Sequence, residues 1–256
     1  MISVEGLYKS FDDKMVLENI NATFENGKTS LIIGQSGSGK TVLMKCIVGL
    51  LLPDKGDILY DGRNLVMMGK KETKMLRREM GMIFQNAALF DSMTVLENVM
   101  YPLNMFSSDN LKERTKRAMF CLDRVNLTEA SGKYPGEISG GMQKRVAIAR
   151  AIALNPQYLF CDEPNSGLDP KTSLVIDELI HDITQEYDMT TIINTHDMNS
   201  VLGIGDKVIF ICGGTEEWEG TKDDIFTSQN KPLNDFIFAS DLLRKVKDVE
   251  VQGLEG

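Results

Sequence analysis

One glycine-rich segment has the residue types and the spacing that bind phosphate. Gly34-Gln35-Ser36-Gly37-Ser38-Gly39-Lys40-Thr41 follows the pattern G-x-x-x-x-G-K-S/T, between a β-branched run and a helix-like apolar run. Glycines let the backbone wrap closely, so that consecutive N–H groups point at a β-phosphate and the next helix directs its positive end there. Lys40 would bridge the β- and γ-phosphates, and the Thr41 hydroxyl would bind Mg²⁺. The segment predicts a nucleotide site, with a ligand-free glycine turn as the alternative.

A pair of adjacent acids ends an apolar run farther along the chain. Tyr158 to Cys161 is followed directly by Asp162 and Glu163. Packing does not explain such a pair, because an unpaired buried charge costs several kcal/mol. Asp162 would hold Mg²⁺ through its water shell, and Glu163 would orient or deprotonate an attacking water. Taken alone, the pair also fits a solvated loop entry, but the glycine-rich segment upstream favours the nucleotide interpretation.

Strands and helices must position these residues, and the hydrophobic pattern predicts them in alternation. Strands are predicted over residues 4–11, 16–24, 29–33, 56–60, 80–84, 158–161, 190–194, 208–212 and 215–219, and helices over residues 41–52, 71–79, 94–101, 111–125, 141–154 and 170–186. This order is typical of an α/β protein with a mostly parallel sheet. A helical insertion is expected from about residue 86 to 153, and a charged helical tail from about Lys222.

Composition and charge limit the classes of protein. The 256 residues carry 28 Lys+Arg against 37 Asp+Glu, a net charge of −9, and 42% are hydrophobic, which excludes a disordered chain, a disulfide scaffold and an integral membrane protein. The acidity argues against coating of DNA or lipid headgroups, because both need a basic footprint. The four cysteines lack C-x-x-C spacing and are expected to be buried free thiols. No signal peptide or membrane-length apolar run is evident, so we expect a cytoplasmic protein.

A further motif identifies a family. Ile138-Ser139-Gly140-Gly141-Met142 precedes an amphipathic run, and here the chain resembles the ATP-binding-cassette (ABC) ATPases, whose signature reads L-S-G-G-Q. The other family motifs follow in order: Phe11 (A-loop), Gln85 (Q-loop), Ser166-Gly167-Leu168-Asp169 (D-loop) and His196 (switch histidine). The resemblance covers about residues 2 to 225. It implies a P-loop NTPase (RecA-like) core with an antiparallel β subdomain and a helical subdomain at about 86–153, together residues 1–230, and a C-terminal helical tail at 231–256.

The resemblance also implies roles for individual residues. Two copies would associate head to tail, with ATP between the glycine-rich segment of one copy and Ser139-Gly140-Gly141 of the other. Phe11 would stack on adenine, and the remaining ATP contacts would come from Gly34, Gln35, Ser36, Gly37, Ser38, Gly39, Lys40, Thr41 and Val42. Gln85 would reach Mg²⁺ and the water, His196 would hold the γ-phosphate, and Asp169 would connect the two sites.

Two positions depart from the family pattern. Met142 replaces the usual Gln of the signature, which removes any polar contact from that position. Val42 replaces a common second hydroxyl after the lysine, which weakens a contact to the α-phosphate. Neither change removes Lys40 or Glu163, so we expect an active ATPase that uses ATP and Mg²⁺.

The segment after Gln85 bears on the type of ABC protein. A single cassette without membrane spans suits the separate ATPase subunit of a transporter, with a membrane permease as partner and a small regulatory subunit and a substrate-binding protein as further candidates. Ala88-Leu89-Phe90, Thr94 to Val99 and Tyr101-Pro102-Leu103 look like the Mla-type ATPases, which energise phospholipid movement between bacterial membranes. Methionine-import and lipoprotein-release ATPases have related sequences after the Q-loop. A soluble ABC ATPase acting on DNA or ribosomes is the other class, against which the acidity and the short insertion argue, so no nucleic-acid partner is expected.

Two apolar segments keep more than one interpretation each. The residues from Asn86 to Leu103 suit either a groove for a permease helix or the core of the helical subdomain. The tail carries an apolar stripe that would pack on its own domain, on a second copy or on a regulatory subunit: Leu233, Phe236, Ile237, Leu243 and Val246.

Overall fold

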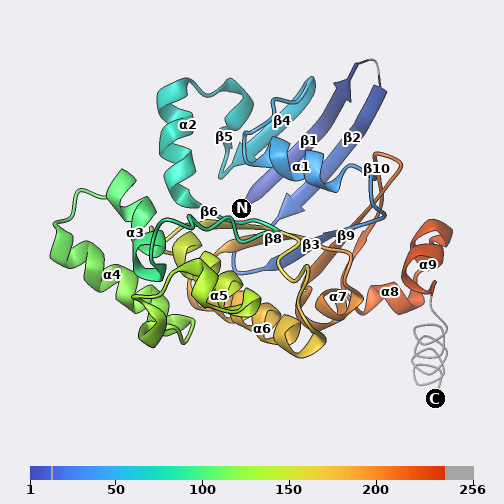
Figure 1. The fold of residues 1–256 in the computed structure, drawn as a ribbon. Coiled ribbons are helices and arrows are strands. Elements are labelled where there is room, and N and C mark those ends of the chain that lie inside the picture. The colour runs from blue at the N-terminus through green and yellow to red at the C-terminus, as the bar shows by residue number, and fades with distance from the viewer. Residues whose placement is uncertain (13, 240–256) are drawn as a thin grey trace. The chain divides into compact units, whose positions relative to one another are not determined.

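The computed structural model describes residues 1–12 and 14–239, which form two compact units (Figure 1). The first unit comprises Met1–Glu25, Thr29–Met67 and the described chain from Asn194 onward. The second unit comprises Asn26–Lys28 and Met68–Ile193.

The first unit contains an antiparallel sheet in the order β2-β1-β4-β5. Its strands are β1 (Ile2–Phe11), β2 (Lys14–Phe24), β4 (Lys55–Tyr60) and β5 (Arg63–Asn64). Ile2 pairs with Phe24 of β2 and with Tyr60 of β4. All three side chains are fully buried, which is expected where alternating residues of a strand face the core.

A second group of strands in the first unit leads into the glycine-rich segment. β3 (Thr29–Ile33) pairs in parallel with β9 (Lys207–Cys212), and β9 pairs antiparallel with β10 (Thr215–Gly220). All five residues of β3 are buried, as expected for a strand in the interior of a parallel sheet. The chain leaves β3 through Gly34 and enters α1 (Lys40–Ile47), which therefore starts at the carboxyl end of a buried strand. A short 3-10 turn, Leu65–Met67, follows β5.

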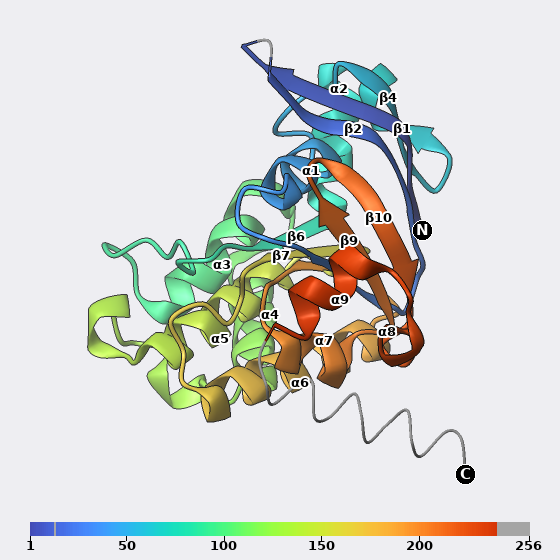
Figure 2. The same ribbon diagram turned by 90° about the vertical axis from the view of Figure 1, so that its right-hand side faces the viewer.

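Short helices complete the first unit: α7 (Met198–Ile204), α8 (Asp224–Thr227) and α9 (Lys231–Ile237). Figure 2 shows α9 beside the hairpin of β9 and β10. Leu233 and Ile237 are buried, and the Phe236 ring stacks on Phe210 of β9 with 5.4 Å between centroids. The first part of the predicted apolar stripe thus packs on its own unit, while Leu243 and Val246 lie outside the described residues.

The second unit combines three strands with five α-helices. The strands run in the order β8-β7-β6, with bounds Thr190–Asn194, Tyr158–Asp162 and Met80–Ile83. The helices are α2 (Lys70–Leu76), α3 (Val95–Phe106), α4 (Leu111–Arg124), α5 (Gly140–Ala151) and α6 (Pro170–Glu186). Single 3-10 turns occupy Arg77–Glu79, Thr128–Ala130 and Pro135–Glu137. Helices α3, α4 and α5 pack against one another, as Figure 1 shows.

The predicted α/β fold class is confirmed, and of the helices predicted by residue range, only the one over residues 170–186 has the predicted bounds. The helix predicted over 41–52 ends at Ile47, because Gly49 adopts a φ of 69° and the Leu50 N–H returns to the Lys45 carbonyl. Helix α3 continues past Pro102 to Phe106. Helix α7 was not predicted, because seven residues containing Gly203 give a weak helical pattern. Within the described ranges, no helix combines the length and the apolar character that crossing a bilayer requires.

The cysteines are free thiols, as predicted, and all but one are fully buried. Cys46, Cys121 and Cys161 are buried, whereas Cys212 is half-buried. Burial raises the pKa of Cys46 and of Cys121 to about 11, and it also raises the pKa of Cys161. Because the thiolate is the reactive form, these three thiols stay protonated and inert near neutral pH.

The thiol chemistry gives a direct test of this packing. With a thiol reagent at about pH 8, the native protein should react at about one thiol per chain, Cys212, and at all cysteines after denaturation. Absorbance of the released chromophore measures the count. In the Cys212→Ser variant the native reaction should disappear, and rapid reaction of that variant would contradict the burial of the other three.

Candidate functional site

The glycine-rich segment holds three glycines with positive φ in the first unit. Gly34, Gly37 and Gly39 have φ values of 148°, 80° and 109°. A Cβ on Gly34 would lie 2.2 Å from the Ile211 carbonyl oxygen, and one on Gly39 would lie 2.7 Å from Leu17 Cδ2. A Cβ on Gly37 would meet nothing within 4 Å. Two glycines are therefore required by packing inside the unit, and the third is required by its backbone angle in an open part of the loop.

Lys40 and Ser38 point their polar atoms into this loop. Lys40 is 8% exposed, and its Nζ donates to the carbonyl oxygens of Gly34 at 2.7 Å and Gln35 at 3.0 Å. Ser38 Oγ is buried and finds no hydrogen-bond partner within the described chain. A buried ammonium, an orphaned hydroxyl and the N-terminus of α1 together fit a polyphosphate, which supplies the acceptor oxygens.

The other predicted residues of the first unit lie at strand ends and in α1. Phe11 ends β1 and is 42% exposed, with Lys9 Nζ 5.4 Å from its ring centroid. His196 is exposed just after β8, and its neighbour Thr195 donates its N–H to the Ile32 carbonyl of β3 at 3.2 Å. Gln35, Ser36 and Thr41 are exposed and Val42 is half-buried. The strand that leads into the glycine-rich segment thus also anchors the segment of His196.

In the second unit, Gln85 lies between the D-loop and helix α5. Its Nε2 donates to Ser166 Oγ at 3.0 Å, and its carbonyl oxygen accepts from Lys144 Nζ. Lys144 is 5% exposed in α5, and burial lowers its pKa while the nearby negative charge of Glu163 opposes that shift. One buried cation therefore contacts the Gln85 backbone and lies within electrostatic reach of Glu163.

A second cation of α5 holds the next residues of the same loop. Ala87 and Ala88 adopt positive φ values of 58° and 48°. The Arg150 guanidinium donates to both of their carbonyl oxygens at 2.7 Å. Positive φ is uncommon outside glycine, so these bonds stabilise a strained backbone. The sequence motifs assign no role to Lys144 or Arg150; the signal that could have found them is three cations, Lys144, Arg145 and Arg150, on a helix otherwise rich in Ala, Val and Ile.

The two adjacent acids lie where strand β7 ends. Asp162 is its last residue, and Glu163 follows with a φ of 50°, a left-handed conformation that costs about 1–3 kcal/mol outside glycine. Across residues 1–12 and 14–239, no group of three or more His, Cys, Asp or Glu side chains could hold a metal by itself. Asp162 offers one carboxylate, which is the kind of ligand that Mg²⁺ takes when water and substrate phosphate complete its shell.

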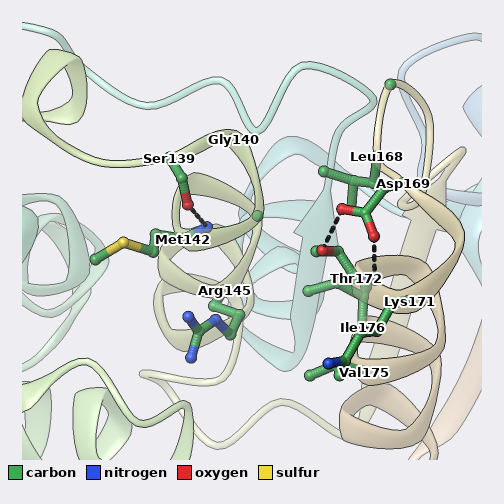
Figure 3. A pocket seen from close by; sticks show the side chains of 12 residues that line it. Ser139, Gly140, Met142, Arg145, Leu168, Asp169, Lys171, Thr172, Val175 and Ile176 are labelled. Atoms are coloured by element: carbon green, nitrogen blue, oxygen red, sulfur yellow. Dashed lines mark hydrogen bonds between the residues drawn. The ribbon is translucent and has the colours of Figure 1, made fainter.

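The signature residues line one side of a pocket of about 490 Å³ (Figure 3). Ser139 caps α5, with its Oγ accepting from the Met142 N–H at 3.3 Å. On the other side, Asp169 caps α6: one carboxylate oxygen accepts from the Thr172 N–H at 3.1 Å and the other from Thr172 Oγ1 at 2.5 Å. These hydrogen bonds lower the pKa of Asp169. The Met142 side chain points away from Leu168 and Asp169.

The second unit therefore brings together Gln85, the acids, the signature residues and Asp169, while the first unit holds the glycine-rich segment, Phe11 and His196. Each group has a distinct chemical capacity. The first offers backbone N–H groups, an ammonium and an exposed aromatic ring to a nucleotide. The second offers a carboxylate base with a positioned amide, and a helix N-terminus beside a carboxylate.

Comparison with known protein families gives one family match. A family described as ABC transporter matches residues 17–166. The chain is 36% identical over 236 residues to a probable ribonucleotide transport ATP-binding protein of Mycobacterium tuberculosis, covering 92% of this chain and 66% of that protein. It thus spans just under two thirds of that relative's length.

Further relatives differ in the transport named in their descriptions. The intermembrane phospholipid transport ATP-binding protein of Haemophilus influenzae is 36% identical over 239 residues, 93% of this chain and 90% of that protein. The methionine import ATP-binding protein of Carboxydothermus hydrogenoformans is 38% identical over 238 residues, 91% of this chain and 70% of that protein. Among solved structures, the dimeric bacterial ABC transporter cassette MJ0796 matches with a TM-score of 0.79 at 33% identity, over 87% of this chain and 99% of that one.

The position of Lys144 generates a prediction about turnover. Lys144→Met should lower ATP turnover at least about tenfold, because the Gln85 carbonyl loses its donor and Glu163 loses a nearby cation. Nucleotide affinity should stay within about threefold, because the glycine-rich segment belongs to the first unit. Steady-state kinetics and an equilibrium titration with a fluorescent ATP analogue measure the two quantities.

Two variants control for charge removal and for folding. Lys144→Arg keeps a cation and should retain more turnover than Lys144→Met, and Lys112→Met removes an exposed lysine of α4. Turnover of Lys144→Met equal to that of Lys112→Met would show that the buried cation has no part in the reaction.

Proposed function

Because the chain belongs to the ABC transporter family of ATPases, we propose that it is the ATP-hydrolysing subunit of a transporter that moves phospholipid. The assignment as an ATP-hydrolysing subunit rests on the nucleotide motifs, which occur along the chain in the order typical of the family. Two observations support phospholipid as the transported substrate. The sequence after Gln85 looks like that of the phospholipid-transport ATPases, and the Haemophilus relative is matched over 90% of its length.

ATP would bind to the glycine-rich segment of the first unit. Loop N–H groups and Lys40 would neutralise the β- and γ-phosphates, with the carbonyl bonds of Lys40 giving way to phosphate oxygens. Phe11 would stack on adenine and His196 would hold the γ-phosphate. Mg²⁺, when bound, would neutralise charge that develops between the β- and γ-phosphates; the proposed holders are Thr41, Gln85 and Asp162.

A second copy of the chain would complete the site. Ser139, Gly140 and Gly141 form the start of α5, where N–H groups that lack a partner in the helix can bind a γ-phosphate in trans. Asp169 borders the same pocket and would connect the two nucleotide sites. The dimeric form of the 33% identical cassette supports association of two copies.

Hydrolysis would depend on Glu163 as the base that orients and deprotonates the attacking water. Glu163 directly follows the last residue of β7 and has a backbone φ of 50°, which sets the direction in which its side chain leaves the strand end. Gln85, held through both its side chain and its carbonyl, would position the same water. The chemistry is then mostly positioning and charge stabilisation.

The catalytic assignment is tested with Glu163→Gln. This variant should lose at least about a hundredfold in ATP turnover, because the amide cannot accept a proton. It should also accumulate as an ATP-bound dimer, detected by light scattering during gel filtration. Glu178→Gln, which changes an exposed acid of α6, is the matched control. Equal turnover of the wild type and Glu163→Gln would overturn the assignment.

A surface groove of the second unit is the proposed place of the permease. A cavity of about 470 Å³ has Arg150 in its lining and is otherwise lined mostly by apolar side chains in β6, after β6 and along α3: Met80, Met82, Phe84, Phe90, Tyr101, Pro102 and Phe106. The Phe90 and Tyr101 rings lie 4.6 Å apart, and Phe84 and Phe90 are each 40% exposed. Exposed aromatic side chains around an apolar groove suit an amphipathic helix of a membrane partner.

One buried amide fixes the loop that carries Phe90 of this groove. Asn98 is fully buried, its Oδ1 accepts from the Phe90 N–H at 2.8 Å, and its Nδ2 donates to the carbonyl oxygens of Phe90, Met93 and Thr94 at 3.0–3.1 Å. These bonds fix the loop that carries Phe90. A permease bound in this groove would hold the chain at the inner face of the cell membrane.

Charge in the groove should prevent docking. Phe90→Asp should lower the amount of permease recovered with the chain at least about tenfold, because a carboxylate would be desolvated on binding. Leu111→Asp is the matched control, since Leu111 is 64% exposed at the start of α4 and does not line the groove. Equal recovery with the two variants would place the permease elsewhere.

The transported substrate and the other partners are tested together. The affinity-tagged chain is purified from membranes in mild detergent, and the recovered proteins and lipids are identified by mass spectrometry. The proposal predicts a permease and enriched phospholipid, and ATP turnover of the complex that responds to lipid. Recovery of an amino-acid permease without lipid response would favour the methionine-import alternative. A regulatory subunit or a substrate-binding protein would appear in the same sample.

A further inference from the structure

Helices α5 and α6 approach each other closely at one pair of residues, Gly141 and Thr172. A Cβ built on Gly141 would lie 2.7 Å from Thr172 Cγ2, and the next atom, Thr172 Cβ, would be 4.0 Å away. Carbon atoms that are not bonded prefer about 3.5–4.0 Å. Only glycine therefore fits at position 141 as long as the Thr172 methyl group stays where it is.

The Thr172 side chain cannot easily turn that methyl group away. Its Oγ1 donates to one Asp169 carboxylate oxygen at 2.5 Å, while its N–H donates to the other oxygen at 3.1 Å. Threonine is stiff about its Cα–Cβ bond because both branches start at Cβ. Rotation that moved the methyl group from Gly141 would also take the hydroxyl from Asp169. The same rotamer of Thr172 therefore places the methyl group beside Gly141 and keeps the hydroxyl bonded to Asp169.

From this geometry we infer that Thr172 is a positioning residue that links the signature helix to the D-loop. Its hydroxyl sets the orientation of the Asp169 carboxylate, and its methyl group fills the space beside Gly141 so that no larger residue fits there. The inference rests on the proposed function, in which Gly141 and Asp169 both lie at the interface where two copies of the chain enclose ATP. Gly141 is then required by a contact inside its own chain.

The neighbouring glycine offers an internal contrast. A Cβ on Gly140 would meet nothing nearer than Leu168 Cδ2 at 4.0 Å, which is ordinary contact. Both glycines stand in the first turn of α5 beside the same pocket. A defect that arises from Thr172 must therefore appear at Gly141 and not at Gly140.

The test combines substitutions at the two positions in the full chain. Gly141→Ala should lower ATP turnover at least about tenfold, with equilibrium affinity for a fluorescent ATP analogue within about threefold of the wild type. Thr172→Ser keeps the hydroxyl and removes Cγ2, and should stay within about threefold of wild-type turnover. The double variant Gly141→Ala/Thr172→Ser should recover to within about threefold of Thr172→Ser, because the clashing atom is gone.

Two controls separate the clash from other effects. Thr172→Val keeps a methyl group and removes the hydroxyl, so it should lower turnover and fail to rescue Gly141→Ala. Thr172→Ser should not rescue any defect of Gly140→Ala. Thermal unfolding of every variant shows whether the chain is folded. ATP-dependent dimerisation, measured in the Glu163→Gln background, shows directly whether two copies still associate around ATP.

The outcomes distinguish the inference from the proposed function. If the wild type hydrolyses ATP and Thr172→Ser does not improve Gly141→Ala, then Gly141 is required for another reason and the inference is wrong. Wild-type turnover in Gly141→Ala, or equal rescue of Gly140→Ala, would overturn it too. Absence of ATP turnover in the wild type would instead overturn the proposed function.

Discussion

Helix α5 lies so close to β6 at one end and to α6 at the other that a glycine is needed at each contact, and the rest of the second unit depends on this packing. Near its C-terminal end, a Cβ on Gly81 of β6 would lie 2.6 Å from the Ala151 carbonyl oxygen. At its N-terminal end, Gly141 faces Thr172 of α6. Because an α-helix is stiff over the twelve residues of α5, the contacts at its two ends determine where every side chain between them points.

Those intervening side chains explain how one helix serves several parts of the candidate site. Lys144 and Arg150 turn inward and hold the loop from Gln85 to Ala88 by its carbonyl oxygens. Burial of a cation is costly unless it is hydrogen-bonded or paired, and here the carbonyl groups and the charge of Glu163 supply the compensation. A small shift of α5 would therefore move this loop and change the electrostatic environment of Glu163.

The first unit uses the same device around the glycine-rich segment. Gly34 and Gly39 lie against backbone or core atoms of β9 and β2, so the loop is fixed at both ends, while Gly37 between them faces open space. A loop held in this way keeps its N–H groups oriented before a ligand arrives, which reduces the ordering that binding requires. The orphaned Ser38 hydroxyl inside it then has a natural partner in a phosphate oxygen.

Periodicity and short motifs are local properties of the chain, and they were enough to predict the fold class, most of the element order and the family. The bounds of Pro170–Glu186 and Thr190–Asn194 were predicted without error. The end of α1 and the short helix α7 were missed, since a single turn residue or a weak pattern decides them. No local pattern predicts that Lys144 binds the carbonyl group of a residue 59 positions away or that Thr172 faces Gly141. Such contacts depend on how helices pack, and packing distances are not encoded in any local pattern.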